Sequence, residues 1–349
     1  MSTVDEVALL DRARAGDSGA FEELVAPYRV ELHAHCYRLL ASIHDADDAM
    51  QDALVGAWRG LAGFEGRSSL RAWLYRIATH AAYRVGSRRP RRQLSIDVAP
   101  ACADPWLLGD PFDGPVWVEP YPAGRVDALV GDPAVAYDAR EGVELAFVAA
   151  LQHLPASQRA VLLLREVLAF SASEVADLLG LSVAAVNSQL QRARATLLRR
   201  LPDRTQQAVL RDLGEEAERL VQGLVVAWES RDVEAFVVLL ADDVRLAMLP
   251  LPAWFDGVAA VRGFLVERMF ATPWRLQATT ANGQLALVCY QGDPRRPDDS
   301  SAYLLGGLTL LTLRDGRVAS LTSFLAPLVL DGFKLSPSWT DESAPPAVS

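Results

Sequence analysis

The feature that most limits how this 349-residue chain can fold is a stretch rich in proline, glycine and aspartate, which runs from Ile96 to Arg140. Proline and glycine deny much of this stretch both helical and strand hydrogen bonds, so it divides the chain. Helical periodicity fills the residues before it and resumes over about residues 143–201. We therefore predict two helical domains, at residues 1–95 and 142–203, joined by an acidic linker at residues 96–141.

The linker carries several large aromatic side chains, which are Trp106, Phe112, Trp117 and Tyr121. Disordered segments are usually poor in aromatic residues, so this composition indicates a segment that packs on a folded surface. We expect the linker to dock on another part of the protein or on a partner.

Beyond residue 203 the pattern changes from helices to strands. Two amphipathic helices, at about 206–229 and 233–240, precede strand-like runs, and Asn282-Gly283 and Asp315-Gly316 are typical of tight hairpin turns. This order predicts a separate α+β domain at residues 204–340, followed by a disordered tail at residues 341–349. The expected fold class is multidomain, with two all-α domains followed by an α+β domain.

The net charge of −10 disfavours a nucleic-acid partner at first sight, but the charges are segregated along the chain. Residues 1–66 hold 12 acidic residues and 5 arginines, whereas residues 67–96 hold 8 arginines and no acidic residue. An acidic part therefore lies next to a basic part that is suited to nucleic acid.

The N-terminus lacks the basic and then apolar order of a signal peptide, and no stretch is apolar for the roughly 18 residues that a membrane helix needs. These features predict a cytoplasmic protein with no membrane partner. The three cysteines, Cys36, Cys102 and Cys289, are widely spaced and match neither a disulfide framework nor a zinc site. We expect free thiols, no metal site and no cofactor.

A first candidate site lies on a predicted helix from Asp45 to Trp58. Its small and apolar residues fall on one side, while Asp45, Asp48 and Asp52 recur at helical spacing near Gln51. This acidic face would be either solvated or bound to a basic partner. Like charges one turn apart slightly destabilise a helix, which favours a partner.

A second candidate site is the arginine-rich region from Phe64 to Arg92. Ser69 is placed to cap a helix that would expose arginines interleaved with aromatic residues. Arginines bind phosphates and aromatic rings stack on unpaired bases, so the mixture suits single-stranded nucleic acid. Taken alone, the pattern is equally compatible with a membrane surface or an acidic protein. The candidate residues are Phe64, Arg67, Ser68, Arg71, Trp73, Tyr75, Arg76, His80, Arg88 and Arg89.

A third candidate site, from Ser171 to Arg194, has the pattern of a helix-turn-helix. A short helix is followed by a turn at Gly180 and by a second helix that Ser182 is placed to cap. Outward polar residues of the second helix suit base edges, and its arginines suit phosphates. A helical hairpin that binds no DNA is the alternative. The candidate residues are Asn187, Ser188, Gln191, Arg192 and Arg194.

These motifs, in this order, resemble the extracytoplasmic-function class of sigma-70 factors over about residues 5–202. The matching stretches are DAxDxxQDxxxxxW, FxxxSSLRxWLYRIAT, LPxxQRAVLLLRE and SxxEVAxLLGxSxxAVxSxLxRAR. The resemblance implies that residues 1–95 are sigma region 2 and residues 142–203 are sigma region 4.

The resemblance also implies the partners, which are core RNA polymerase and promoter DNA. The residues that it assigns to the polymerase are Asp45, Asp48, Gln51 and Asp52. The region from Arg67 to Arg92 would recognise and melt the minus-10 element, and the helix from Asn187 to Arg194 would read the minus-35 element in the major groove. Arg159 lies where the family packs region 4 and approaches the DNA backbone. His80 stands where the family commonly has asparagine, so the contact of that position with a flipped base is not carried over.

Residues 204–340 resemble the SnoaL-like, NTF2-type cone domain that some sigma factors of this class carry. The resemblance rests on the two helices, the stretch PAWFDG at residues 252–257 and the closing hairpins. Relatives of that fold include enzymes with His/Asp acid-base pairs, but all five histidines of this chain precede residue 204. Asp242, Asp243 or Asp256 would have to act alone as a base, so we expect no enzymatic activity.

The C-terminal domain is expected to regulate the protein. Trp254, Phe255, Trp274 and Tyr290 would line an apolar cavity for a small-molecule ligand, or the domain would set the spacing of the DNA-binding domains. An inert domain with an aromatic core is the alternative. Two other functions remain open from the residues alone: a ligand-responsive helix-turn-helix repressor, and a DNA-binding module fused to a small-molecule enzyme.

Overall fold

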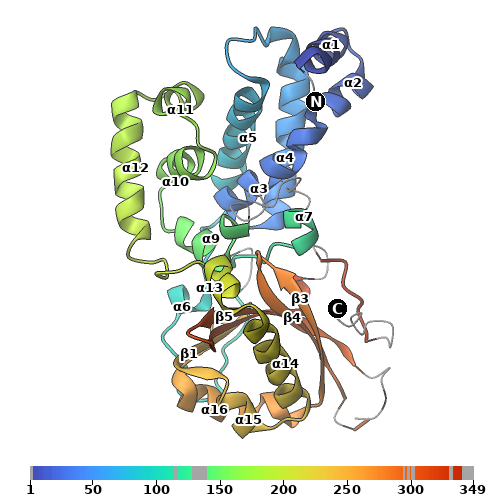
Figure 1. Ribbon diagram of the computed structural model, residues 1–349, viewed down its shortest axis with the longest axis vertical. Helices are drawn as coiled ribbons and strands as arrows, with labels where there is room; N and C mark the ends of the chain where they lie inside the picture. Colours follow the sequence, from blue (N-terminus) through green and yellow to red (C-terminus); the bar gives the residue numbers. More distant parts are fainter. Residues whose placement is uncertain are drawn as a thin grey trace. The chain divides into compact units, whose positions relative to one another are not determined.

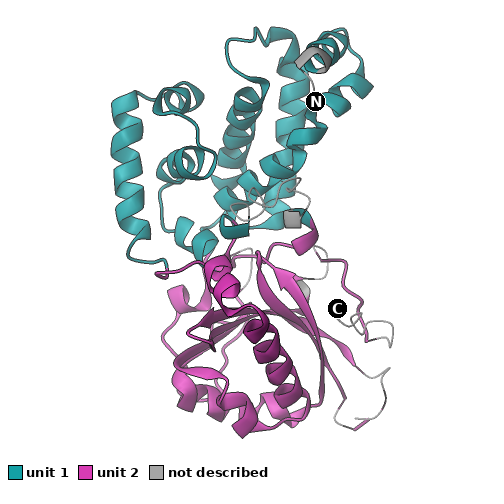
Figure 2. Cartoon of the chain, viewed as in Figure 1, with its two compact units in different colours: residues 1–92, 125–142, 146–201 teal, residues 93–124, 143–145, 202–349 magenta. Residues whose placement is uncertain are grey.

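The computed structural model describes residues 3–112, 116–127, 140–293, 295–296, 299, 303–329 and 333–339. The chain forms two compact units that do not follow the order of the sequence (Figure 2). Unit 1 contains residues 1–92, 125–142 and 146–201, and unit 2 contains residues 93–124, 143–145 and 202–349. The predicted tail at residues 341–349 lies outside the described residues.

The first part of unit 1 is a helix bundle in which α4 packs against α3 and α5 (Figure 1). Small side chains on one side of α4, including Ala46, Ala49 and Ala53, are buried and allow close packing, which confirms the predicted stripe. The hydroxyls of Ser42 and Ser69 cap α4 and α5. The helices of this part are α1 (Thr3–Arg14), α2 (Ser18–Val25), α3 (Arg29–Leu40), α4 (Ile43–Gly60) and α5 (Leu70–Gly86).

The second part of unit 1 contains the predicted helix-turn-helix. Ser171 and Glu174 form a capping box at the start of the first helix, and Gly180 ends it in the left-handed conformation, with φ of 66°. Ser182 then caps the second helix by accepting the backbone N–H of Ala185 at 3.1 Å. The elements are α9 (Leu145–Leu151), α10 (Ala156–Leu162), a π-helical turn (Leu163–Val167), α11 (Ala172–Leu179) and α12 (Val183–Leu197).

Unit 2 is built on a six-stranded sheet in the order β2-β1-β6-β5-β4-β3, in which only β1 and β6 are parallel. The predicted turns at Asn282-Gly283 and Asp315-Gly316 are confirmed, and all four residues have positive φ. The strands are β1 (Leu240–Leu249), β2 (Trp254–Asp256), β3 (Trp274–Ala281), β4 (Gln284–Gln291), β5 (Leu304–Arg314) and β6 (Arg317–Leu325).

The helices of unit 2 pack on this sheet and complete an α+β domain (Figure 1). The predicted helix at 206–229 is interrupted at Gly214, where φ is 51°. Buried side chains from α14, α16 and the sheet form one hydrophobic core. The helices are α13 (Gln206–Leu213), α14 (Glu215–Glu229), α15 (Val233–Val237) and α16 (Gly257–Glu267).

The first part of the linker, residues 93–124, belongs to unit 2. It contains the short helix α6 (Ser95–Val98), and α7 (Ala123–Asp127) begins at its end. Trp117 and Tyr121 are fully buried, whereas Trp106 and Phe112 are exposed. The described residues of this first part of the linker therefore dock on the protein itself, as the aromatic composition predicted.

The described part of the chain can be compared with the expectations about membrane helices, metal sites and cysteines. No helix there is long and apolar enough to cross a membrane, and no group of three His, Cys, Asp or Glu side chains there could hold a metal. All three cysteines are free thiols. Burial raises the pKa of Cys36 and of Cys289 to about 12.

Candidate functional site

The outward face of α12 carries the predicted minus-35 residues. Asn187, Gln191, Arg192 and Arg194 are exposed and Ser188 is half-buried, so the structure brings all five onto one surface. Arg192 donates to the Ser188 hydroxyl at 2.6 Å and Arg194 to the Glu166 carboxylate at 2.6 Å. Four of the five, all except Arg192, line a shallow hollow together with Arg165, and this hollow offers both hydrogen-bonding groups and positive charge.

The arginine-rich region divides into exposed and packed residues. The exposed residues are Arg67, Ser68, Arg76, His80, Arg88 and Arg89. Phe64 is buried with its ring 5.0 Å from that of Trp73, which is half-buried. Tyr75 is fully buried against His35, 5.1 Å between ring centroids, so Tyr75 supports α5 and is not available to stack on a base. The expectation for Tyr75 was wrong because its ring is on the core side of the helix.

Arg71 was expected to be exposed but is half-buried within unit 1. Its guanidinium pairs with the Glu31 carboxylate at 3.0 Å and lies over the rings of Tyr75 and Phe170, at 4.9 and 5.2 Å. Phe170 belongs to the helix-turn-helix part of the chain, so Arg71 joins the two helical parts of unit 1.

The predicted acidic face of α4 is only partly available. Asp48, Gln51 and Asp52 are exposed, but Asp45 is buried and forms ion pairs with Arg92 and, at 3.1 Å, with Arg89. The prediction that Asp45 contacts a partner is therefore not met in this structure. Helical spacing places Asp45 near Asp48 but carries no information about arginines more than 40 residues away.

Arg159 lies at a second contact between the two helical parts of unit 1. It donates to the carbonyls of Leu39 and Leu154 and, at 2.6 Å, to the side chain of Gln152. Burial and the nearby charge of Arg91 lower the pKa of Arg159 to about 10. Nearby, the Tyr83 hydroxyl donates weakly to the Ala156 carbonyl, at 3.4 Å. The NH groups at the end of the Arg159 guanidinium thus already donate hydrogen bonds to other groups of the protein.

The turn between β3 and β4 fixes both ends of the linker in unit 2. The Asn282 side chain accepts the backbone N–H of Tyr121 at 2.7 Å and donates to the backbone carbonyl of Val143 at 2.8 Å. The Gln284 side chain accepts the N–H of Leu145 at 2.8 Å. The sequence predicted the hairpin turn at Asn282-Gly283, but no sequence pattern predicted that the side chains of Asn282 and Gln284 would bind the linker backbone.

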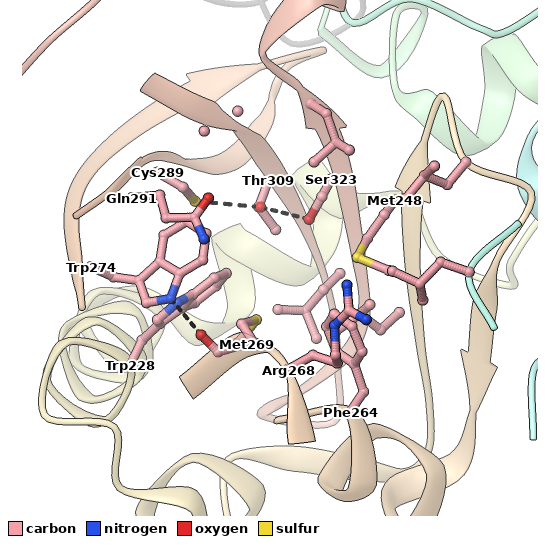
Figure 3. A pocket seen from close by; sticks show the side chains of 17 residues that line it. Trp228, Met248, Phe264, Arg268, Met269, Trp274, Cys289, Gln291, Thr309 and Ser323 are labelled. Carbon is pink, nitrogen blue, oxygen red and sulfur yellow. Dashed lines mark hydrogen bonds between the residues drawn. The ribbon is translucent and has the colours of Figure 1, made fainter. Parts of the chain in front are cut away.

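A cavity of about 210 Å³ lies in the core of unit 2 (Figure 3). Trp274 lines it, but the other predicted residues do not. Phe255 is packed in the core beside Phe264, Tyr290 packs on Trp339, and the Trp254 indole donates to the Ala99 carbonyl at 2.8 Å. Aromatic composition alone could not distinguish core rings from cavity rings. The side chains that sequence reasoning missed include Trp228, Met248, Phe264, Arg268, Thr309 and Ser323.

The three aspartates considered as a catalytic base lie away from this cavity. Asp242 is fully exposed, Asp243 pairs with Arg314, and Asp256 pairs with Arg245 at 3.4 Å. The described residues that line the cavity include neither a carboxylate nor a histidine. The wall therefore supplies hydrogen-bond donors and one positive charge, from Arg268.

Three family models match the chain in the order of its parts. Sigma-70 region 2 matches residues 24–92, Sigma-70 region 4 matches residues 144–197, and a SnoaL-like domain matches residues 221–321. The first two cover the arginine-rich region and the helix-turn-helix, and the third covers much of the sheet domain.

The chain is also similar to curated proteins and to a solved structure. It is 39% identical over 332 residues to the ECF RNA polymerase sigma factor SigG of Mycobacterium tuberculosis, which covers 93% of this chain and 85% of SigG. It is 26% identical over 197 residues to SigW of Bacillus subtilis, which covers 56% of this chain and 95% of SigW. The crystal structure of the extracytoplasmic function sigma factor SigJ of M. tuberculosis superposes with a TM-score of 0.57 at 24% identity, over 90% of this chain and 99% of SigJ.

Proposed function

This chain belongs to the extracytoplasmic-function family of RNA polymerase sigma factors, and we propose that its C-terminal domain controls it by holding the linker between regions 2 and 4. As a sigma factor, it directs core RNA polymerase to specific promoters and helps to open them. The observation that carries the proposed control is the docking of residues 93–124 and 143–145, at both ends of the linker, in the same unit as the C-terminal domain.

Contacts between regions 2 and 4 within unit 1 support a closed resting state. The minus-10 and minus-35 elements lie about 25 base pairs apart, or about 85 Å at roughly 3.4 Å per base pair. Helices α5 and α11, one from each region, pack directly against each other. Reading both elements at once requires these helices to separate, so promoter binding and the closed form of unit 1 exclude each other.

The exposed residues support specific roles in the open form. Asn187 and Gln191 would read base edges of the minus-35 element, with Arg192 and Arg194 on phosphates. The surface offered to polymerase would be Asp48, Gln51 and Asp52, without Asp45. The minus-10 contacts would come from Arg67, Ser68, Arg76, His80 and Arg88, joined on opening by Arg71 and Arg89.

Run-off transcription with core polymerase tests this function. Asn187→Ala with Gln191→Ala should reduce transcription from minus-35-dependent promoters but leave binding to core polymerase unchanged. Asp48→Ala with Asp52→Ala should instead reduce co-purification with polymerase. Arg219→Gln removes an exposed charge from α14 in the C-terminal domain and is the control that should change neither measurement.

The repressor alternative makes the opposite prediction for the free chain. A repressor binds its duplex operator without polymerase, whereas a closed sigma factor needs polymerase before it binds tightly. Tight, sequence-specific binding of the free chain to promoter duplex, together with no stimulation of core polymerase, would overturn the proposed function.

A further inference from the structure

The cavity in unit 2 has apolar walls that match a single aromatic ring. Trp228 and Trp274 form one wall, with ring centroids 5.9 Å apart and planes at 66°; Met269 lies beside them, and Phe264 lies beside Arg268 (Figure 3). An apolar cavity of about 150 Å³ accepts benzene. The volume of about 210 Å³ in this protein therefore accommodates one ring with a small substituent.

Some polar groups of the cavity have donor capacity that the described residues do not use, whereas the Trp274 indole N–H already donates to the Met269 carbonyl at 2.7 Å. The buried Trp228 indole N–H has no hydrogen-bond partner among the described residues. The hydroxyls of Thr309 and Ser323 lie 2.8 Å apart on adjacent strands, and only one of their two protons can lie between them. Arg268 also lines the cavity, and none of the ion pairs found in the described ranges includes it. A ligand with a negatively charged acceptor would satisfy these groups.

We propose that this cavity binds a compact aromatic carboxylate, and that the bound ligand stabilises the docked linker. The ring would lie against Trp228 and Trp274, and the carboxylate would take hydrogen bonds from donors of the wall, with Arg268 supplying the opposite charge. The effect of the ligand on transcription rests on the proposed function, but its binding does not.

The linker closes part of the cavity, which is why a ligand there affects docking. Leu108 of the linker lines the cavity, and the Trp106 ring lies 4.6 Å from the Arg268 guanidinium. A third contact comes from Cys102, which lies in the sequence between α6 and Trp106. Its backbone N–H donates to the carbonyl of Trp254 in β2 at 2.7 Å. A ligand inside the cavity would touch Leu108 only while the linker is docked, and it would also touch Arg268, which the Trp106 ring of the docked linker contacts.

Gly109 shows how closely the linker passes over this region. Its φ is +72°, and a Cβ atom there would lie 2.7 Å from Cγ of Pro252. The linker backbone thus passes close to Pro252, which follows the cavity-lining residue Leu251, and no side chain fits at position 109 without a shift. A ligand that binds only the docked form shifts the ratio of docked to undocked linker about 100-fold when its concentration is 100 times its Kd.

Binding is tested by calorimetry on the full chain with three probes of similar size: phenylacetate, toluene and benzylamine. Phenylacetate should bind more tightly than toluene, and benzylamine more weakly than either. Arg268→Gln should weaken phenylacetate binding about tenfold or more but leave toluene binding unchanged. Arg268→Lys should restore part of the loss. Arg262→Gln is the matched control, because Arg262 lies in α16, which ends just before Arg268, but pairs with Glu234 away from the cavity.

Trp228→Phe provides a second variant that keeps an aromatic ring, although a smaller one, and removes the indole N–H. It should weaken phenylacetate binding and not toluene binding, and this remains measurable if Arg268→Gln fails to fold. No saturable binding of any probe, or phenylacetate affinity that is unchanged in both variants, would overturn the site.

Coupling to the linker is measured by hydrogen exchange of residues 100–112 with and without phenylacetate. Exchange should slow on binding, and Leu108→Ala should remove most of this protection. Unchanged or faster exchange in the parent would overturn the coupling. Run-off transcription without ligand reports on the proposed function separately, so failure of the site and failure of that function are distinguishable.

Discussion

Replacing Asn282 by glycine should release the linker from unit 2 while preserving the turn that carries Asn282. The residue has φ of 52°, a conformation that asparagine tolerates and glycine adopts freely. Its side chain is fully buried and binds the backbone of Tyr121 and of Val143, which stand at the two ends of residues 122–142. The substitution therefore removes both side-chain bonds of the clamp without straining the backbone, and it leaves the backbone bond from the N–H of residue 282 to the Tyr121 carbonyl.

The size of the effect follows from the two backbone groups that lose their partners. The Tyr121 N–H and the Val143 carbonyl would be left buried and unpaired, and each such group costs about 1–3 kcal/mol. The docked linker should thus lose at least about 2 kcal/mol, which is roughly a 30-fold change in the ratio of docked to undocked forms. Undocking lets water reach both groups, so release relieves the cost.

Hydrogen exchange of the peptides that contain Tyr121 and Val143 measures this release directly. The matched control is Asp315→Gly, because Asp315 has φ of 51° in the equivalent hairpin turn between β5 and β6 but is exposed. Exchange should accelerate in the Asn282 variant only. Equal exchange in the two variants would refute the clamp, and faster exchange without increased run-off transcription would refute linker control.

Three further effects can be measured on the same protein. Ser182→Ala should destabilise region 4 by about 1 kcal/mol in urea unfolding, because α12 loses its N-cap; an unchanged midpoint would contradict this. Burial lowers the pKa of the His35 side chain to about 3. The neutral side chain therefore makes its full contribution to the free energy of unfolding above the unfolded pKa of about 6.5. This contribution decreases as the pH falls, by about 2 kcal/mol at pH 5. His35→Gln should lack this part of the pH dependence in unfolding measurements from pH 7 to 5. Phe170→Ala removes the ring that Arg71 and Tyr75 contact, so energy transfer between dyes on α5 and α11 should decrease; unchanged transfer would show that this contact does not hold unit 1 closed.

The helix-turn-helix was predictable because its determinants are local. The caps at Ser171 and Ser182, and the left-handed residue Gly180, fix where each helix begins and ends within a few residues of themselves. The hairpin turn at Asn282-Gly283 was readable for the same reason. By contrast, β2 spans only Trp254–Asp256 and pairs on one side, so no periodicity could reveal it.

The sites that depend on distant residues could not be read in this way. The partners of Asp45 lie more than 40 residues later, and those of Asn282 more than 130 residues earlier. Whether an aromatic residue lines a cavity depends on what covers it, which is why Trp274 was placed correctly and Tyr290 was not. Docking of the linker was predictable from composition, but the surface that receives it was not.

Several arginine contacts within unit 1 are of a kind that promoter DNA can replace. Arg71, Arg89 and Arg91 are half-buried or exposed, and each already contacts a group of unit 1. Exposed ion pairs contribute about 0–1 kcal/mol, and phosphates offer partners to all three arginines together with counterion release. Opening therefore exchanges partners and leaves no arginine unpaired. The pair of Asp45 and Arg92 differs because both side chains are at most 4% exposed, and breaking it would leave a buried charge at a cost of about 3–5 kcal/mol. That pair should stay closed when the others open, so we expect Asp45 to hold region 2 together, and the proposed contact with polymerase would then fall to Asp48 and Asp52.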